Sequence, residues 1–522
     1  MRRLQALLFA STLLCVHLSA AQGDVDAAFS RFWAAPSPGE AAALVDDVAR
    51  SGVTFDEAYR RLRDGRPYTT QPTGLVEFTN ELPNLAPHPY SVFVPSSYDP
   101  HKKTPVRVQL HGGVGRERPN GPSAVSEASA FAEQAPDHIF VVPLAWRDAP
   151  WWTEDQIINV RRILDRVKRQ YNIDENRISL AGLSDGGTGA YYFGMREPDA
   201  FASFLPMLGM ALVLANDQMG VEGSLFPNNL RYKPFFVVNG GRDPLYPIDR
   251  VQLYLDRFKA GGMEIDYRPQ PQAGHDRSWW PSLKDPLSAF VQSHPRNPLP
   301  DRLTWETLST RSHNRTDWLV IDTLGSAAGE AKVLDDLNLL QLESAVDFGA
   351  RGIGARIIQV AAGSNAEEFG LKAFDTLVEL NGETVKMASE LSDVLADIKP
   401  GTTIELLVAR NNLPVELKGV YAPKAVVPPP QEFFPHDARS GRVDLVRTGN
   451  TIDATTRGVS AFTLLLSPDQ FDFDQPVKVV ANRRVVFNGR VVKSLVTLMK
   501  WAAAENDRTR MFGAELHLDL TK

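Results

Sequence analysis

Residues 182–186, Gly-Leu-Ser-Asp-Gly, constrain this chain more than any other segment. The five residues before them, 177–181, have the apolar character of a short buried strand, and residues 188–195 favour a helix. A serine in the turn between a strand and a helix fits a nucleophile elbow, a strained turn that exposes the hydroxyl above a sheet. Glycines are needed on both sides because neighbouring backbone approaches too closely for a Cβ. The segment therefore predicts a nucleophilic serine, Ser184.

A serine hydroxyl is a weak nucleophile, so it needs a general base and a group that orients the base. In folds with this elbow the acid and then the histidine follow the serine along the chain. Asp243 comes shortly after the apolar run 235–238, and His275 follows the next expected strand, 265–269. Both loops leave the carboxyl edge of a sheet, where the elbow also points. We therefore predict that Asp243 orients His275, which accepts the proton of Ser184.

Other residues of the chain could serve as the orienting acid or as the general base. Asp276 and Asp249 are alternatives to Asp243, because an aspartate before a proline is also common in a plain turn. His88, His101 and His111 precede the serine and are poor candidates for the base.

The oxyanion site is expected at two backbone N–H groups. Residues 111–113, His-Gly-Gly, close the predicted strand 106–110, and such a strand-end glycine loop can polarise an acyl carbonyl. Gly113 would supply one N–H group. Asp185, the residue after the serine, would supply the second.

Two tryptophan pairs, Trp151–Trp152 and Trp279–Trp280, are expected in loops beside the same edge. Packing would account for half of these four side chains. Tryptophans near the mouth of a site also suit flat groups such as sugar rings and phenolic acyl groups. They are predicted to bind substrate, which slightly favours carbohydrate-linked esters over peptides.

Strands and helices alternate between residues 75 and 295. Such alternation predicts an α/β fold, a mostly parallel sheet with helices on both faces. Three prolines, Pro295, Pro298 and Pro300, mark a linker at its end. The expected strands are 90–95, 106–110, 139–142, 177–181, 235–238 and 265–269, and the expected helices are 155–171, 248–259 and 285–292.

The N-terminus is typical of a secretory signal peptide, residues 1–21. Arg2 and Arg3 precede an apolar stretch, 4–16, that is too short to span a membrane comfortably. Its removal would take away Cys15, the one cysteine of the chain, and would change the net charge from -7 to about -9 by loss of two arginines. That charge argues against nucleic-acid binding. We expect a secreted or periplasmic protein without a membrane span. Residues 24–72 are predicted to form a helical N-terminal segment.

Residues 346–422 resemble a PDZ domain along nearly their whole length. The resemblance lies in the strand-like 356–360, the segments 363–371 and 375–382, and the expected helix 389–398. It implies that the domain binds an extended peptide by β-augmentation. Its carboxylate-binding loop would comprise residues 351–355, and strand 355–360 would pair with the peptide. The peptide-binding residues are Gly352, Ile353, Gly354 and Ala355.

The segments on either side of this unit are rich in expected strands. Residues 301–345 and 435–522 are predicted to form one β-rich domain interrupted by the PDZ insertion, with the prolines 428–430 stiffening the return. Within the PDZ resemblance, Phe374 stands where the family usually has glycine. This difference should alter a turn and leave the fold unchanged.

The motifs of the α/β segment resemble those of secreted bacterial α/β-hydrolases of the feruloyl-esterase and polyhydroxybutyrate-depolymerase type. The resemblance takes in peptidases related to prolyl oligopeptidases and covers residues 75–293. It rests on residues 98–100, 111–113, 182–187, 241–243 and 274–275. It implies serine acyl hydrolysis without metal or organic cofactor, which agrees with the lack of metal-ligand spacing in the sequence.

Three hypotheses follow from the sequence. The first is a secreted serine esterase whose PDZ domain binds a peptide or the substrate. The second is a serine peptidase of prolyl-oligopeptidase type, because the same triad cleaves amides. The third is an inactive hydrolase-fold scaffold whose PDZ domain binds partners. The serine, acid and histidine in the expected order speak against the third.

Overall fold

The computed structural model describes residues 23–82, 86–119, 135–246, 248–332, 334–340, 345–353, 355–387, 391, 395, 398–422, 424–426, 431–436 and 438–521. The predicted signal peptide, residues 1–21, lies outside this part of the chain. The chain divides into two compact units, one made of residues 1–338 and 434–522 and the other of residues 339–433. No helix in the described part is long and apolar enough to cross a membrane.

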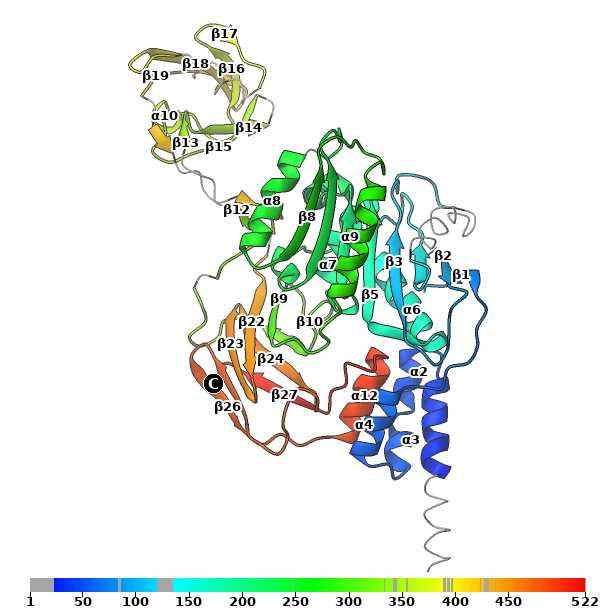
Figure 1. Cartoon of the computed structure of the whole chain (residues 1–522). Coiled ribbons are helices and arrows are strands. Elements are labelled where there is room, and N and C mark those ends of the chain that lie inside the picture. The colour runs from blue at the N-terminus through cyan, green and yellow to red at the C-terminus, as the bar shows by residue number, and fades with distance from the viewer. Residues whose placement is uncertain are drawn as a thin grey trace, which may run out of the picture. The chain divides into compact units, whose positions relative to one another are not determined.

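An eight-stranded sheet forms the centre of the first unit (Figure 1). Its order is β1-β2-β4-β3-β5-β6-β7-β8; β1 and β2 are antiparallel to their neighbours, and the strands from β4 to β8 run parallel. This mixed sheet, with a serine turning out of its middle strand into a helix, has the α/β-hydrolase fold. The strands are β1 Gly74–Asn80, β2 His88–Val94, β3 Thr104–Leu110, β4 Ile139–Pro143, β5 Ile173–Leu183, β6 Ser203–Met207, β7 Pro234–Gly240 and β8 Glu264–Gln270.

Helices cover both faces of this sheet, as predicted. Successive residues of a strand point to opposite faces. Phe204 and Phe235 lie against Gly194 of α7, whereas their neighbours Leu205 and Phe236 pack in the core that contains α9. The helices α7 and α9 therefore lie on opposite faces. The helices of this region are α6 Glu154–Gln170, α7 Asp185–Arg196, α8 Ile248–Ala260 and α9 Trp280–Ser293.

Two further sheets join segments from before and after the second unit. The five-stranded sheet has the order β26-β25-β23-β22-β9, and the four-stranded sheet has the order β10-β11-β24-β27. Their shared core includes Trp305, Trp318 and Phe462. The strands are β9 Arg302–Thr307, β10 Arg315–Thr316, β11 Leu319–Leu324, β22 Gly441–Thr448, β23 Thr451–Arg457, β24 Val459–Leu466, β25 Val477–Ala481, β26 Arg484–Gly489 and β27 Ala514–Asp519.

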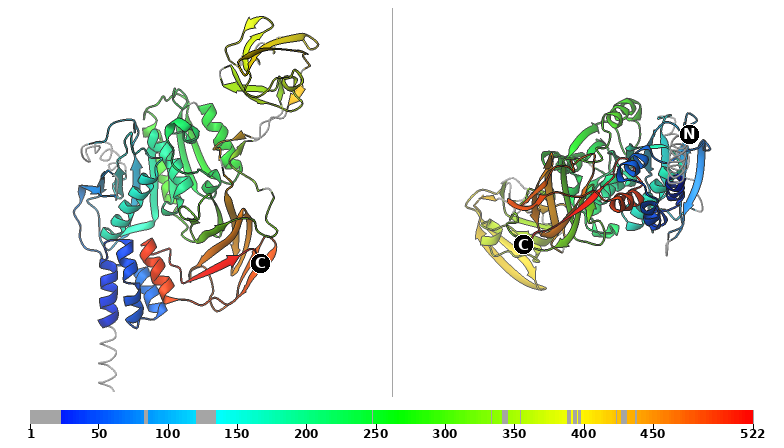
Figure 2. Two further views of the ribbon diagram at one scale, coloured as in Figure 1. Left: turned by 180° about the vertical axis from the view of Figure 1, so that it is seen from behind. Right: turned by 90° about the horizontal axis from the view of Figure 1, so that it is seen from below.

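The N-terminal helices pack against a helix from near the other end of the chain, α12 Leu495–Glu505 (Figures 1 and 2). The first helix covers residues 23–34, and its Phe29 is fully buried in the shared core with Leu498 of α12. A turn at Leu44 separates the second helix from the third. The remaining helices are α2 Pro38–Ala43, α3 Val45–Arg50 and α4 Phe55–Asp64.

The second unit contains a sheet of order β14-β15-β16-β18-β19, with β17 paired to β16. Its core includes Phe348, Ile357 and Leu406. Two short pairs, β12 with β21 and β13 with β20, connect its ends. Its elements are β12 Leu339–Leu340, β13 Ala345–Asp347, β14 Ala350–Ile353, β15 Arg356–Val360, α10 Asn365–Glu368, β16 Thr376–Leu380, β17 Glu383–Thr384, β18 Thr403–Arg410, β19 Leu413–Val420, β20 Lys424–Val426 and β21 Gln431–Glu432.

One expectation for this unit is wrong. The sequence assigned the peptide-pairing edge to residues 355–360, but β15 lies between β14 and β16 and both of its edges have a neighbour. The outer strand of the described sheet on this side is β14. Gly352 and Ile353 belong to β14 and Ala355 to the turn that follows, while Gly354 and most of the expected helix 389–398 lie outside the described residues.

Candidate active site

Ser184 occupies the strained turn between β5 and α7. Its φ of 55° and ψ of −119° lie in a region that side chains rarely adopt. The glycines are required here: a Cβ on Gly182 would lie 1.9 Å from the carbonyl oxygen of Gly186, and one on Gly186 would lie 2.2 Å from the carbonyl oxygen of Leu110. The backbone N–H of Ser184 donates to Met207 on β6, 2.9 Å away. The turn is therefore anchored to the neighbouring strand.

The structure brings Ser184, His275 and Asp243 into one hydrogen-bonded line. The Nδ1 atom of His275 lies 2.7 Å from Oδ2 of Asp243, and its Nε2 lies 2.8 Å from Oγ of Ser184. A carboxylate accepts only, so Nδ1 carries the proton and Nε2 is left to accept from the serine hydroxyl. This arrangement leaves the imidazole ready to take up that proton.

Asp243 is fully buried, but both of its oxygens are satisfied. Its Oδ1 accepts the backbone N–H groups of Leu245 at 2.8 Å and Tyr246 at 3.2 Å, and its Oδ2 faces His275. Asp276 instead accepts the N–H groups of Gly274 and Ser278 and so forms a local turn. The side chain of Asp249 lies outside the described part of the chain.

The earlier histidines have structural contacts of their own. His111 has Nε2 3.0 Å from the backbone N–H of Ala145, from which it accepts, and Nδ1 2.9 Å from the carbonyl oxygen of Gly112, to which it donates. His88 is buried, with Nδ1 2.8 Å from the carbonyl oxygen of Ala86. Burial lowers the pKa of His88.

The loop after β3 passes directly over the serine. A Cβ on Gly112 would lie 2.9 Å from Cβ of Ser184, so only glycine fits there. Gly113 has a positive φ of 71°. The backbone N–H of the next residue, Val114, donates to the Asp185 carboxylate at 2.9 Å. The sequence indicated a backbone role for Asp185, but it did not reveal that its side chain ties this loop to the nucleophile elbow.

The four tryptophans were predicted to bind substrate, with packing accepted for half of them, and the prediction is wrong for three. Trp151, Trp152 and Trp279 are only 0%, 2% and 4% exposed. The indole of Trp151 donates to the carbonyl oxygen of His111 at 2.7 Å, and that of Trp152 donates to Met219 at 2.8 Å. These rings pack in the interior and have no face open to a ligand. Trp280 is partly buried against the same core as Trp279, and its role stays a prediction.

Tyr246 is a site residue that sequence reasoning missed. It is buried beside the triad, with its ring centre 5.5 Å from that of His275 at a steep angle. Burial raises the pKa of the Tyr246 hydroxyl, and the charge of Asp185 raises it further, while hydrogen bonds with Thr188 and Ser184 lower it. The only sequence signal for Tyr246 was its place three residues after Asp243.

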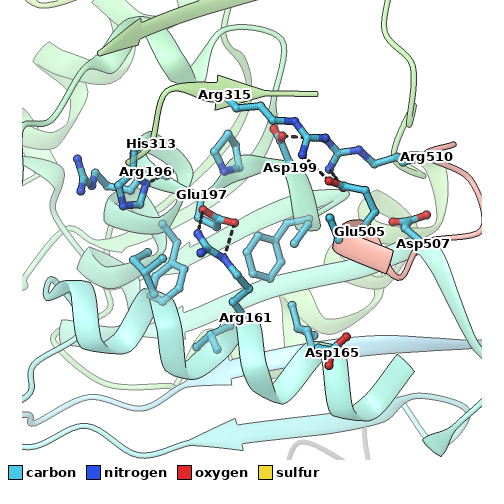
Figure 3. A pocket seen from close by; sticks show the side chains of 18 of the residues that line it. Arg161, Asp165, Arg196, Glu197, Asp199, His313, Arg315, Glu505, Asp507 and Arg510 are labelled. Carbon is cyan, nitrogen blue, oxygen red and sulfur yellow. Dashed lines mark hydrogen bonds and ion pairs between the residues drawn. The ribbon is translucent and has the colours of Figure 1, made fainter. Parts of the chain in front are cut away.

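A cavity of about 480 Å³ has none of the three triad residues in its lining. Figure 3 shows this cavity from close by. Its walls come from α6, the loop before β10 and the chain around α12, and their charged side chains pair with one another. His313 contacts the Glu154 carboxylate at 2.8 Å. Burial alone would raise the pKa of Glu154, but His313 and Arg196 lower it to about 2. The fully enclosed Arg510 bonds Asp199 at 3.0 Å.

No group of three or more His, Cys, Asp or Glu side chains able to hold a metal occurs among the residues that the structure describes. The side chains that converge at Ser184 are those of an acid–base pair and a nucleophile. This set can transfer an acyl group from a substrate carbonyl to the serine oxygen.

Comparison with known proteins separates the two units. Residues 331–418 match the model of the PDZ domain. The second unit contains a PDZ domain. A probable periplasmic serine endoprotease of the DegP-like type from Rhizobium meliloti (strain 1021) is 29% identical over 155 residues, which are 28% of this chain and 30% of that protein. The prediction of an α/β-hydrolase sheet combined with a β-rich region and a PDZ domain is confirmed.

Other similarities concern esterases. The bifunctional acetylxylan esterase/xylanase XynS20E of Neocallimastix patriciarum is 26% identical over 172 residues, which are 32% of this chain and 23% of that protein. The solved structure of a thermostable esterase aligns with 42% of this chain and 63% of its own, at 23% identity and a TM-score of 0.36. The chain thus spans less than a third of the length of either curated relative.

Proposed function

We propose that this protein is a serine hydrolase that cleaves esters through Ser184, His275 and Asp243. The observation that carries the proposal is the continuous line of hydrogen bonds from the buried Asp243 through His275 to the serine hydroxyl. Its geometry matches the roles of acid, base and nucleophile in a serine triad. An inactive scaffold would have no need for a strained serine placed 2.8 Å from a correctly oriented imidazole.

The proposed reaction has two stages. The Ser184 oxygen attacks the ester carbonyl while His275 takes its proton, and the carbonyl electrons move onto the oxygen. The backbone N–H groups of Gly113 and Asp185 stabilise that oxyanion. The C–O bond to the alcohol then breaks as His275 returns the proton to the leaving oxygen. Water repeats the sequence on the acyl-enzyme, releasing the carboxylic acid and restoring the serine.

Carbohydrate-linked or phenolic acyl esters remain the proposed substrates. The acetylxylan esterase relative and the resemblance to feruloyl esterases support this choice, whereas the tryptophans no longer do, because three of them are buried. The second candidate is a serine peptidase of prolyl-oligopeptidase type, because the same triad cleaves amides. Matched ester and peptide substrates with the same acyl group would separate the two. We also propose that the protein acts in the periplasm or outside the cell, on the strength of its predicted signal peptide.

A fluorophosphonate probe tests the nucleophile. The wild-type chain should be labelled, Ser184→Ala should not be, and its ester turnover should fall by at least about a thousandfold. Ser282→Ala, which removes a hydroxyl bonded to the carbonyl oxygen of Trp279 in α9, is the matched control and should keep its labelling. Labelling that survives Ser184→Ala would show that the elbow assignment is wrong. An unlabelled, inactive wild type would favour the scaffold.

We further propose that the PDZ unit binds an extended peptide by adding it as a strand, with β14 as the edge. A library of terminal peptides offered to the full chain tests this proposal, with scrambled peptides as the control. If deletion of residues 349–420 lowers activity on large substrates and spares a small chromogenic ester, the unit recruits or gates substrate. If no peptide binds above the scrambled control, a purely structural role is left.

A further inference from the structure

We infer that Arg116 selects substrates whose acyl group carries a carboxylate. This inference rests on the proposed ester hydrolysis and, among the proposed substrates, favours carbohydrate-linked esters of dicarboxylic acids over phenolic acyl esters. Arg116 belongs to the loop after β3 that would supply the oxyanion N–H of Gly113. Three features of the molecule support this role: the loop is held in place, the Arg116 guanidinium lies beside it, and no carboxylate among the described residues pairs with that guanidinium.

The loop between Gly112 and Arg116 is fixed at successive residues. Gly112 lies against the side chain of Ser184, and the N–H of Val114 is held by Asp185 at 2.9 Å. Arg147 holds the other end of the loop. Its guanidinium donates to the carbonyl oxygen of Gly115 at 3.1 and 3.2 Å, and its backbone N–H donates to the carbonyl oxygen of Arg116 at 2.9 Å. The backbone of Arg116 therefore has a set position relative to the nucleophile.

The Arg116 side chain folds back over this loop. A Cβ built on Gly113 would lie 3.6 Å from its Nε and Nη2 atoms and 3.7 Å from its Cζ. The guanidinium therefore lies beside Gly113, on the side where a side chain of that residue would project. If the N–H of Gly113 binds the oxygen of an ester carbonyl, the Arg116 charge would lie near the acyl group of that ester.

The charge of Arg116 is also unused within the described part of the chain. No ion pair or side-chain hydrogen bond is formed by its guanidinium there, although the side chain is exposed. Its neighbours differ: Arg118 donates to the carbonyl oxygen of Pro87 and covers the ring of Trp146, and Arg147 holds Gly115. An unpaired arginine fork beside Gly113 suits a carboxylate, which it can bind through two parallel hydrogen bonds.

The inferred substrate is therefore an ester of a dicarboxylic acid with one free carboxylate. The oxyanion N–H groups hold the ester carbonyl, and the acyl chain must reach from there to the Arg116 guanidinium, beside Gly113. Because the guanidinium lies beside Gly113, we expect a short linker of about two to three methylene groups, as in succinyl or glutaryl esters, with roughly 1.3 Å for each C–C bond. A charge-assisted pair of this kind should favour the charged acyl group about ten- to hundredfold.

Monophenyl glutarate and phenyl pentanoate test the inference, since their acyl chains have equal length and differ in the terminal carboxylate. We would measure kcat/KM for both with the full wild-type chain at pH 7 and with Arg116→Gln, Arg116→Lys and Arg490→Gln. Arg490 is exposed in the β-rich region and is the matched control for loss of one positive charge. The glutarate-to-pentanoate ratio should fall about ten- to hundredfold in Arg116→Gln, fall less in Arg116→Lys, and stay constant in Arg490→Gln.

Two outcomes would overturn the inference. An unchanged ratio in Arg116→Gln would mean that the guanidinium does not meet the acyl carboxylate. An equal loss on both esters would mean that Arg116 acts on the common oxyanion. Fluorophosphonate labelling of Ser184 in each variant keeps this test separate from the proposed function: labelled protein without charge selectivity refutes only the role of Arg116, whereas unlabelled wild type refutes the hydrolase assignment.

Discussion

The bond between the Asp185 carboxylate and the N–H of Val114 tests how residues 112–116, the loop proposed to bind the oxyanion, are positioned. Asp185→Ala removes the carboxylate that accepts this N–H at 2.9 Å, while Val114 itself stays buried. A hydrogen bond to a charged group contributes about 1.5–3 kcal/mol, and each 1.4 kcal/mol is a factor of ten. If the bond serves chiefly to hold Gly113 against the developing oxyanion, kcat should fall roughly ten- to hundredfold with little change in KM.

Asp185→Asn separates the hydrogen bond from the charge. The amide oxygen can still accept from Val114, so only the charged part of the bond is lost, and kcat should fall by about fivefold. The assay is hydrolysis of a chromogenic ester, with the rate of fluorophosphonate labelling as a second readout and the thermal midpoint as a check on folding. Asp148→Ala, an exposed aspartate, should leave all three unchanged. Equal kcat values for Asp185→Ala and wild type would refute the reasoning, as would an Asn variant no better than Ala.

Four further predictions concern the acid, the loop, the buried charges and pH. Asp243→Asn should lower kcat by on the order of ten-thousandfold and Asp276→Asn by only a few-fold; the reverse ranking in a steady-state assay would transfer the acid role. Gly112→Ala should slow probe labelling about a hundredfold, because the new Cβ would lie 2.9 Å from that of the serine, and normal labelling would contradict the close approach. Arg510→Met should lower the free energy of unfolding in urea by about 1.5–3 kcal/mol, since it removes the charged bonds to Asp199 and Glu505 while Lys233 and Arg315 still pair with them, and an unchanged midpoint would speak against that network. The pKa of Glu154 is depressed to about 2, so its contribution is present above pH 4.5 and lost as the pH falls towards 2; Glu154→Gln should flatten the stability profile in that window only.

The proposed catalytic residues could be predicted because their signals in the sequence are local. Ser184 sits in a glycine-bounded turn, and Asp243 and His275 each follow a strand, so sequence order and sheet geometry bring them together. The tryptophans misled for the opposite reason. The partner of the Trp152 indole, Met219, is 67 residues away in the sequence, and no periodicity reveals such a contact. The indole N–H of Trp151 likewise donates to the carbonyl oxygen of His111, which is 40 residues earlier in the sequence.

The pairing of the buried charges and the edge strand of the PDZ sheet could not be predicted from the sequence, for related reasons. Arg510 pairs with Asp199 across 311 positions of sequence, so each residue looks like an ordinary surface charge when seen alone. In the PDZ unit, Ile353 and Arg356 are already partners across a tight hairpin. The sequence pattern does not mark this turn clearly. The outer strand was therefore predicted at residues 355–360, which contain β15, whereas the outer strand on that side of the described sheet is β14.

The pairing of β12 with β21 has a consequence for how the chain folds. Leu339 lies opposite Glu432, so the insert enters and leaves through adjacent strands. For the sheets built on either side of it, a folded insert of this kind behaves as a hairpin turn, whereas an unfolded one would be a loop of about 90 residues whose closure costs entropy. The order of folding then matters. If the insert folds first, the pairing of β9–β11 with β22–β27 costs only the entropy of closing a short loop.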